Sequence, residues 1–105
     1  MKILITGITG FVGINLVKEL LKKNYNIIGV ARNIDKVDKE ISNQIQLIAF
    51  DLNLDSKKLF YRVGIPDVLI HLAWSGLPNY NEDFHLKENL PNNIKFLEVS
   101  IEMGV

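Results

Sequence analysis

The chain has 105 residues, a length that suits one compact domain and is too short for two. Hydrophobic residues make up 48% of it, charged residues 23% and aromatic residues 9%, which excludes a disordered tail and indicates a packed core. Twelve Lys and Arg residues balance twelve Asp and Glu residues, so the net charge gives no reason to expect nucleic acid or an anionic membrane as a partner.

Short apolar runs alternate with amphipathic stretches, which is the pattern of βαβ units. We predict strands over residues 2–6, 26–31, 45–50 and 67–72. Strands joined by helical crossovers pair in parallel, and parallel sheets are buried on both faces. The sequence therefore predicts an α/β protein with a parallel sheet and helices on both faces of it.

Amphipathic spacing predicts the helices. The first begins near Phe11, a short one follows within residues 55–63, and the last covers residues 83–104. Residues 33–44 are polar with isolated aliphatic side chains, so we expect a loop or a short helix there. Pro91 falls inside the last helix, where we expect a kink or a restart because proline lacks the backbone N–H that a helix interior needs.

Three glycines spaced three apart, Gly7, Gly10 and Gly13, join the first strand to the first helix in the stretch TGITGFVG. At this junction Gly7 allows a sharp turn, Gly10 lets an anion approach the main chain, and Gly13 lets the helix pack closely on the sheet. The unpaired amides of the first helical turn then face a phosphate. We interpret the stretch as a dinucleotide pyrophosphate site; the alternative is a merely tight strand-to-helix turn.

TGITGFVG resembles the motif TGxxGFxG of the extended short-chain dehydrogenases/reductases, a family of nucleotide-sugar epimerases, dehydratases and 4-keto-reductases. Asp51-Leu52 is similar to the family's adenine-contacting acidic motif, and HLAW at residues 71–74 is similar to its HLAA motif. The stretch that starts at Asn89 resembles its NVxGTxNLLEA helix. The resemblance spans nearly the whole chain and implies a Rossmann-like sheet in the order 3-2-1-4, incomplete relative to the family.

The resemblance also implies which residues bind the dinucleotide. They lie in the glycine stretch, at or just after the ends of the other three strands, and within the last helix. The set is Gly7, Thr9, Gly10, Phe11, Val12, Gly13, Arg32, Asn33, Asp51, Leu52, Leu72, Ala73, Trp74 and Asn89.

The residue after the second strand selects the cofactor in such folds. An acidic residue there binds the ribose hydroxyls of NAD, whereas an Arg can hold the extra 2′-phosphate of NADP. This chain has Arg32 followed by Asn33, and its first carboxylate is Asp35, which favours NADP. The alternative is that Arg32 is a solvated cation and that Asp35 reaches back to the ribose, which would make the cofactor NAD.

Chemistry in this family resembles hydride transfer supported by a Tyr-x-x-x-Lys pair and by a Ser or Thr on a later strand. None of Tyr25, Tyr61 and Tyr80 has a lysine four residues further on, so we identify no catalytic residue and expect this chain alone to be inactive. By resemblance, residues 1–105 are the N-terminal part of the NAD(P)-binding domain of a longer enzyme, whose catalytic half and substrate domain lie beyond Val105.

Two histidines and one asparagine have alternative interpretations. We expect His71, at a strand end, to be packed and hydrogen-bonded and not catalytic. His85 has no second ligand at usable spacing, so we predict no metal site. Asn89 either positions groups near the active site, as the resemblance implies, or caps the restarted helix.

The expected partners are the dinucleotide and, in the parent enzyme, a nucleotide-sugar substrate. The last helix has two apolar stripes, and the one that does not cover the sheet packs either within the complete domain or in a homodimer, as in extended family members. The stripes are Leu90, Ile94, Leu97 and Ile101, and Phe96, Val99 and Met103.

Composition also bears on location and on the alternatives to an enzyme. The absence of Cys and of any long apolar segment indicates a cytoplasmic protein that does not span a membrane. One alternative to an enzyme segment is a non-catalytic NAD(P)-binding regulatory or sensing module, and another is an inert fragment without cofactor affinity.

Overall fold

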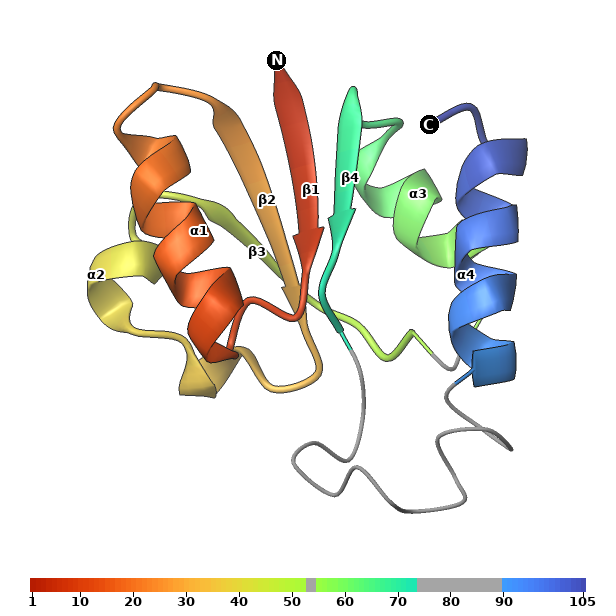
Figure 1. The fold of residues 1–105 in the computed structure, drawn as a ribbon, viewed down its shortest axis with the longest axis horizontal. Coiled ribbons are helices and arrows are strands. Elements are labelled where there is room, and N and C mark those ends of the chain that lie inside the picture. Colours follow the sequence, from red (N-terminus) through yellow and green to blue (C-terminus); the bar gives the residue numbers. More distant parts are fainter. Residues whose placement is uncertain (53–54, 74–89) are drawn as a thin grey trace. The chain divides into compact units, whose positions relative to one another are not determined.

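The computed structural model describes residues 1–52, 55–73 and 90–105 (Figure 1). They divide into two compact units. The first unit comprises residues 1–51 and 66–73 and contains the β-sheet; the described part of the second comprises residues 52, 55–65 and 90–105 and contains two helices.

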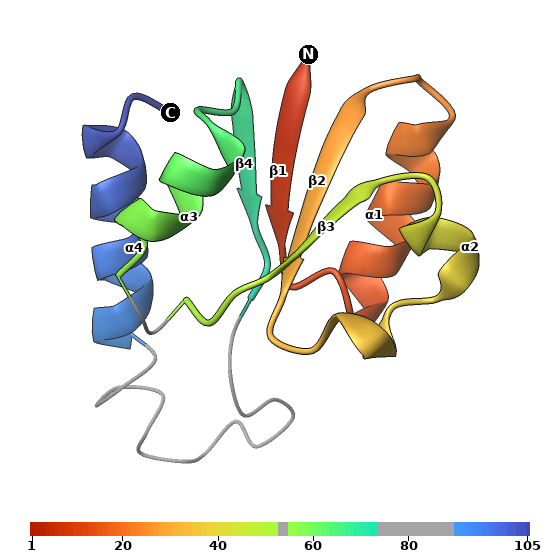
Figure 2. The same ribbon diagram turned by 180° about the vertical axis from the view of Figure 1, so that it is seen from behind.

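The first unit is built on a four-stranded parallel sheet in the order β3-β2-β1-β4, which Figure 2 shows from behind. The strands are β1 (Lys2–Thr6), β2 (Asn26–Ala31), β3 (Gln46–Ala49) and β4 (Val68–His71). The predicted order and all four predicted strands are confirmed. β3 and β4 are one residue shorter at each end than predicted, and the flanking Phe50 and Asp67 amides still donate to neighbouring strands at 3.0 and 2.9 Å.

Three helical segments complete the first unit: α1 (Phe11–Leu21), the 3-10 turn η1 (Ile34–Lys36) and α2 (Lys39–Ser42). The side chains of Asn33 and Asp38 accept hydrogen bonds from amides two residues on, at 3.0 and 2.8 Å, and thereby start η1 and α2. The stretch predicted as a loop or short helix is therefore a 3-10 turn followed by a short helix of 4 residues, which confirms the short-helix alternative.

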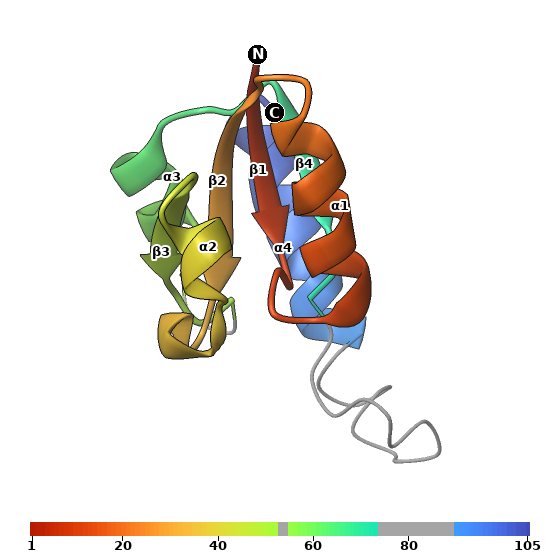
Figure 3. The same ribbon diagram turned by 90° about the vertical axis from the view of Figure 1, so that its left-hand side faces the viewer.

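The core of the first unit lies between the sheet and the helical segments that follow β1 and β2. Side chains of β1 and β2 that point to this face pack with Val17 of α1 and with Ile41 of α2. Figure 3 shows α1 running alongside the sheet. The buried cluster is Ile3, Ile5, Ile8, Val17, Ile27, Ala31, Val37 and Ile41. Helical cover of one sheet face is thus observed, and cover of the other face stays a prediction.

The second unit contains α3 (Lys57–Val63) and α4 (Leu90–Glu102), which lie side by side in Figures 1 and 2. Phe60 of α3 stacks on Phe96 of α4 with ring centroids 6.3 Å apart, and each ring is 1% exposed. α3 ends at Gly64, whose φ of 79° lies in the left-handed region that stops a helix. The predicted stop at this glycine is confirmed.

Pro91 lies in the first turn of α4. Its missing N–H removes no intrahelical hydrogen bond there, because the first amides of a helix have no partner in any case. The described helix begins at Leu90, and residues 83–89 of the predicted helix lie outside the described residues, so the kink or restart at Pro91 stays a prediction. Among the described helices, none combines the length and apolar character that crossing a membrane requires.

Candidate functional site

The strand ends bring the predicted site segments of the first unit to one edge of the sheet. Thr6, the last residue of β1, pairs with Val30 of β2 and with His71 of β4. Because the strands are parallel, the segments that follow them leave the sheet on the same side (Figure 1). Open α/β sheets bind ligands outside these carboxyl ends.

Gly7 makes the turn that leaves β1. Its φ is 73°, a conformation that residues with a side chain rarely adopt. A Cβ on Gly7 would also lie 2.7 Å from the amide nitrogen of Ala73 and 2.7 Å from the carbonyl carbon of Leu72. Two predicted site segments, residues 7–13 (the glycine loop) and residues 72–73, therefore contact each other main chain to main chain.

Gly13 and Gly10 have different surroundings. A Cβ on Gly13 would lie 2.5 Å from the carbonyl oxygen of Gly7 and 2.8 Å from Cα of Ile8, so the start of α1 rests directly on the loop. A Cβ on Gly10 would meet only the Gly7 oxygen, at 3.5 Å, which is an ordinary contact. Gly10 is exposed and has an extended φ of −79°. The chain itself therefore requires glycine at positions 7 and 13 and leaves room for a side chain at position 10.

The N-terminus of α1 is open. Gly10 is its N-cap and has no side chain to accept a hydrogen bond, and the first turn contains no acidic residue. Ile14 is the first residue whose amide reaches the Gly10 carbonyl, at 3.0 Å, so the preceding amides have no intrahelical acceptor. Phe11 and Val12 are 83% and 61% exposed beside them. This end of the helix combines free donors with the positive end of the helix dipole, an arrangement that suits an anion.

Thr6 links the glycine loop to the end of β4, and sequence reasoning did not select it. Its fully buried hydroxyl oxygen accepts hydrogen bonds from the Leu72 and Ala73 amides at 3.1 and 3.2 Å. The same hydroxyl shares a hydrogen bond with Nδ1 of His71 at 2.6 Å. The signal for Thr6 was a hydroxyl at the end of the otherwise apolar run KILIT. The predicted hydrogen-bonded state of His71 is confirmed.

The segment after β2 carries Arg32 and Asn33, both exposed. The Asn33 side-chain oxygen accepts from the Asp35 amide at 3.0 Å, so that oxygen is engaged in the cap of η1. Within the part of the chain that the structure describes, no carboxylate forms an ion pair with Arg32.

The remaining predicted site residues follow β3 and β4 or precede α4 along the chain. Asp51 is half-buried and follows β3 by two residues. Leu52 is half-buried and belongs to the second unit. Trp74 and Asn89 lie outside the described residues, as does His85, for which no site was predicted.

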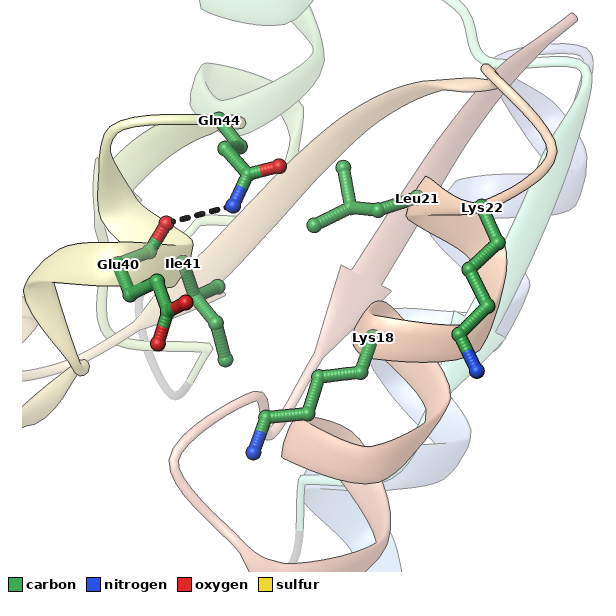
Figure 4. A pocket seen from close by; sticks show the side chains of 6 residues that line it. All are labelled: Lys18, Leu21, Lys22, Glu40, Ile41 and Gln44. Atoms are coloured by element: carbon green, nitrogen blue, oxygen red, sulfur yellow. Dashed lines mark hydrogen bonds between the residues drawn. The ribbon is translucent and has the colours of Figure 1, made fainter.

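A separate hollow of about 470 Å³ lies between α1 and α2, and Figure 4 shows the side chains around it. The Gln44 amide donates to the backbone oxygen of Glu40 at 2.9 Å on one wall. None of the predicted site residues lines this hollow. Its lining consists of Lys18, Leu21, Lys22, Glu40, Ile41 and Gln44. Over residues 1–52, 55–73 and 90–105, no group of three or more His, Cys, Asp or Glu side chains is arranged to hold a metal ion.

The sheet order and the loop at the end of β1 define a Rossmann-like unit. Residues 3–105 match the model of the NAD dependent epimerase/dehydratase family, and the chain belongs to that family. It is 30% identical over 105 residues to a dTDP-6-deoxy-L-talose 4-dehydrogenase (NAD(+)) of Aggregatibacter actinomycetemcomitans. That match covers 100% of this chain and 38% of the dehydrogenase.

Solved structures show the same relationship. The UDP-Glc/GlcNAc 4-epimerase of Campylobacter jejuni superimposes with a TM-score of 0.78 at 25% identity, over 99% of this chain and 34% of the epimerase. A short chain dehydrogenase of Leptospira borgpetersenii with bound NAD+ superimposes with a TM-score of 0.68 at 25% identity, over 97% of this chain and 43% of the dehydrogenase. The chain thus spans less than half the length of each of these relatives.

Replacing Thr6 by valine should destabilise the first unit. Thr6→Val keeps the shape of the side chain but leaves the Ala73 amide and His71 Nδ1 without their partner, a loss of about 1–3 kcal/mol in the free energy of unfolding. Thr6→Ser should retain most of the stability because it keeps the hydroxyl. Urea denaturation measures both. The exposed Thr9→Val is the matched control, and equal stability of Thr6→Val and Thr9→Val would contradict the role of the Thr6 hydroxyl.

Proposed function

We propose that this chain is the dinucleotide-binding segment of a nucleotide-sugar epimerase, dehydratase or 4-keto-reductase. Family membership supports an NAD-dependent enzyme of this kind. The names of two relatives, a dTDP-6-deoxy-L-talose 4-dehydrogenase and a UDP-Glc/GlcNAc 4-epimerase, support a nucleotide-linked sugar with chemistry at its carbon 4.

The observation that carries the proposal is the contrast among the three glycines. Gly7 and Gly13 are explained by close contacts within the chain, whereas Gly10 has space for a Cβ and an ordinary backbone conformation. The absence of a side chain at Gly10 is explained if a bulky ligand lies against the main chain there. The neighbouring open helix N-terminus makes an anionic group, the pyrophosphate of a dinucleotide, the best fit.

The other site residues divide between the two ends of the cofactor. We assign Asp51 and Leu52 to the adenine end, and Leu72, Ala73, Trp74 and Asn89 to the nicotinamide end. The bound nicotinamide would supply hydride transfer. We assign binding and orientation of the cofactor to this chain. Because the chain contains no Tyr-x-x-x-Lys pair, we assign turnover to the whole protein.

Two observations bear on the choice between NADP and NAD. Arg32 is exposed at the end of β2 and has no carboxylate partner among the described residues, which favours a 2′-phosphate. The NAD(+) in the name of the dehydrogenase relative, and the NAD+ bound to the Leptospira dehydrogenase, favour NAD. We propose NADP on the residue that this chain itself carries, with NAD as the second candidate.

Gly10→Val should weaken dinucleotide binding without unfolding the chain. The valine side chain would occupy the space assigned to the pyrophosphate, and overpacking of this kind costs about tenfold or more in affinity. Calorimetric titration with NADH and NADPH, together with thermal unfolding, measures the two effects. Gly13→Val is the contrasting variant: it should unfold the chain because its Cβ would lie 2.5 Å from the Gly7 oxygen. Unchanged dinucleotide affinity in Gly10→Val would refute the site.

Arg32→Asp should change cofactor preference. It removes a charge-assisted hydrogen bond to the 2′-phosphate and offers a carboxylate to the ribose, so the ratio of the NADPH Kd to the NADH Kd should rise about tenfold or more. The control is Lys23→Asp, which makes the same change in net charge at an exposed position beyond the end of α1. An equal ratio in the two variants would mean that Arg32 does not bind the 2′-phosphate.

We also propose that a second copy of this chain joins it through α4. The stripe Leu90, Ile94, Leu97 and Ile101 is 42%, 47%, 42% and 73% exposed. Residues at this spacing share one helix face, and an apolar face that stays in water favours association.

Ile101→Lys should shift the chain towards monomer in sedimentation velocity, because it places a charge in the apolar stripe. Tyr61→Lys is the matched control, since Tyr61 has the same 73% exposure but belongs to α3. A wild-type monomer at all concentrations, or an equal effect of both variants, would contradict the interface.

A further inference from the structure

Gly29 stands in the interior of β2, and its backbone does not require glycine. It is buried, and its φ is not among the positive values found for Gly7, Gly64 and Gly104. Glycine in a strand interior weakens the strand and commonly marks a place that another group approaches closely. The reason for Gly29 must therefore lie in the space beside it.

That space is filled by the tip of a side chain from the glycine loop. A Cβ on Gly29 would lie 2.5 Å from Cδ1 of Ile8, the far end of that side chain, so the Ile8 side chain would have to shift. Cδ1 of Ile45 and Cδ2 of Leu47 would lie at 3.1 and 3.3 Å. Ile8 is 1% exposed and belongs to the buried cluster between the sheet and α1. Cδ1 of Ile8 thus lies where a side chain of residue 29 would be, and we call this space the notch. Side-chain atoms of Ile45 and Leu47 lie beside it.

The backbone of Ile8 is confined as well. Its Cα lies 2.8 Å from the position of a Cβ on Gly13, so the first turn of α1 contacts the main chain of Ile8. The side chain meets β2 and the main chain meets α1, and Ile8 is held between Gly29 and Gly13. Dense packing transmits displacement, so a change in the notch should move the loop.

We propose that Ile8 is a positioning residue for the dinucleotide loop and that Gly29 is its socket. The packing of Ile8 on Gly29 sets the distance between the glycine loop and the sheet, and hence the position of the open amides at the start of α1. Ile8 acts through burial and does not touch the ligand. The effect on cofactor affinity rests on the proposed function; the effect on the loop does not.

A set of four variants tests the socket. Gly29→Ala places a methyl group against Ile8 Cδ1. Ile8→Val removes that Cδ1 atom, so the double variant Gly29→Ala/Ile8→Val relieves the contact. The control double variant combines Gly29→Ala with Ile27→Val, which removes the same methyl from another buried residue of the cluster, on the same face of β2.

The first readout is the set of backbone amide resonances of Gly7, Gly10 and Gly13 without ligand. We expect Gly29→Ala to displace them, Ile8→Val to restore them in the double variant, and Ile27→Val to leave them displaced. The second readout is NADH and NADPH affinity, which should fall about tenfold in Gly29→Ala and recover only with Ile8→Val.

Unmoved loop resonances in Gly29→Ala, or equal rescue by Ile27→Val, would overturn the socket. If Gly29→Ala does not fold, recovery of folding by Ile8→Val alone supports it, and recovery by neither change overturns it. A comparison of Ile8→Ala with Ile27→Ala provides a second test, because only Ile8→Ala empties the space beside Gly29. Equal loop resonances in these two variants would also overturn the proposal. A wild-type chain that binds neither dinucleotide would refute the proposed function. The amide resonances would still show whether the packing of Ile8 on Gly29 positions the glycine loop.

Discussion

Close main-chain contact at the end of β1 is the constraint on which the first unit depends. Gly7 lies against the backbone of residues 72–73, and Gly13 lies against the backbone of Gly7 and Ile8. No residue with a Cβ fits either position. Because the helix and the two strands meet there without intervening side chains, the loop between them has little freedom. The candidate ligand site is therefore formed by the same contacts that join β1, α1 and β4.

Main-chain contact of this kind buries backbone amides that need hydrogen-bond acceptors, and the oxygens of Thr6 are those acceptors. The Leu72 amide is shared between the Thr6 carbonyl and hydroxyl oxygens, at 3.2 and 3.1 Å, and the Ala73 amide donates to the hydroxyl as well. β4 has ended by then, so no strand ladder serves Ala73. A single hydroxyl thus allows the chain to leave the sheet edge with its amides hydrogen-bonded.

Much of the fold was predictable because its signals are local. Strand runs, helical periodicity and the spacing of Gly7, Gly10 and Gly13 involve residues close in sequence, and all four strands and their order are confirmed. The contacts that position the loop are not local. Thr6 bonds an amide 67 positions away, and Ile8 enters a notch on a different strand. From the sequence alone, Thr6 is one more strand residue and Gly29 is a weak point in a strand.

The same comparison separates structural from functional glycines within one motif. Sequence reasoning gave each of the three glycines a plausible reason, but it had no means to test those reasons. The structure provides such a test. The fold explains a glycine when the surrounding atoms or the φ of the residue itself exclude a side chain, and this is the case for Gly7 and Gly13. Gly10 is explained by neither, although Ser, Asp or Asn at this N-cap position would cap the helix better than glycine does. Stability alone would not select glycine at position 10. Because Gly10 lies at the positive end of the helix dipole, we explain it by the space that it leaves for an anionic ligand.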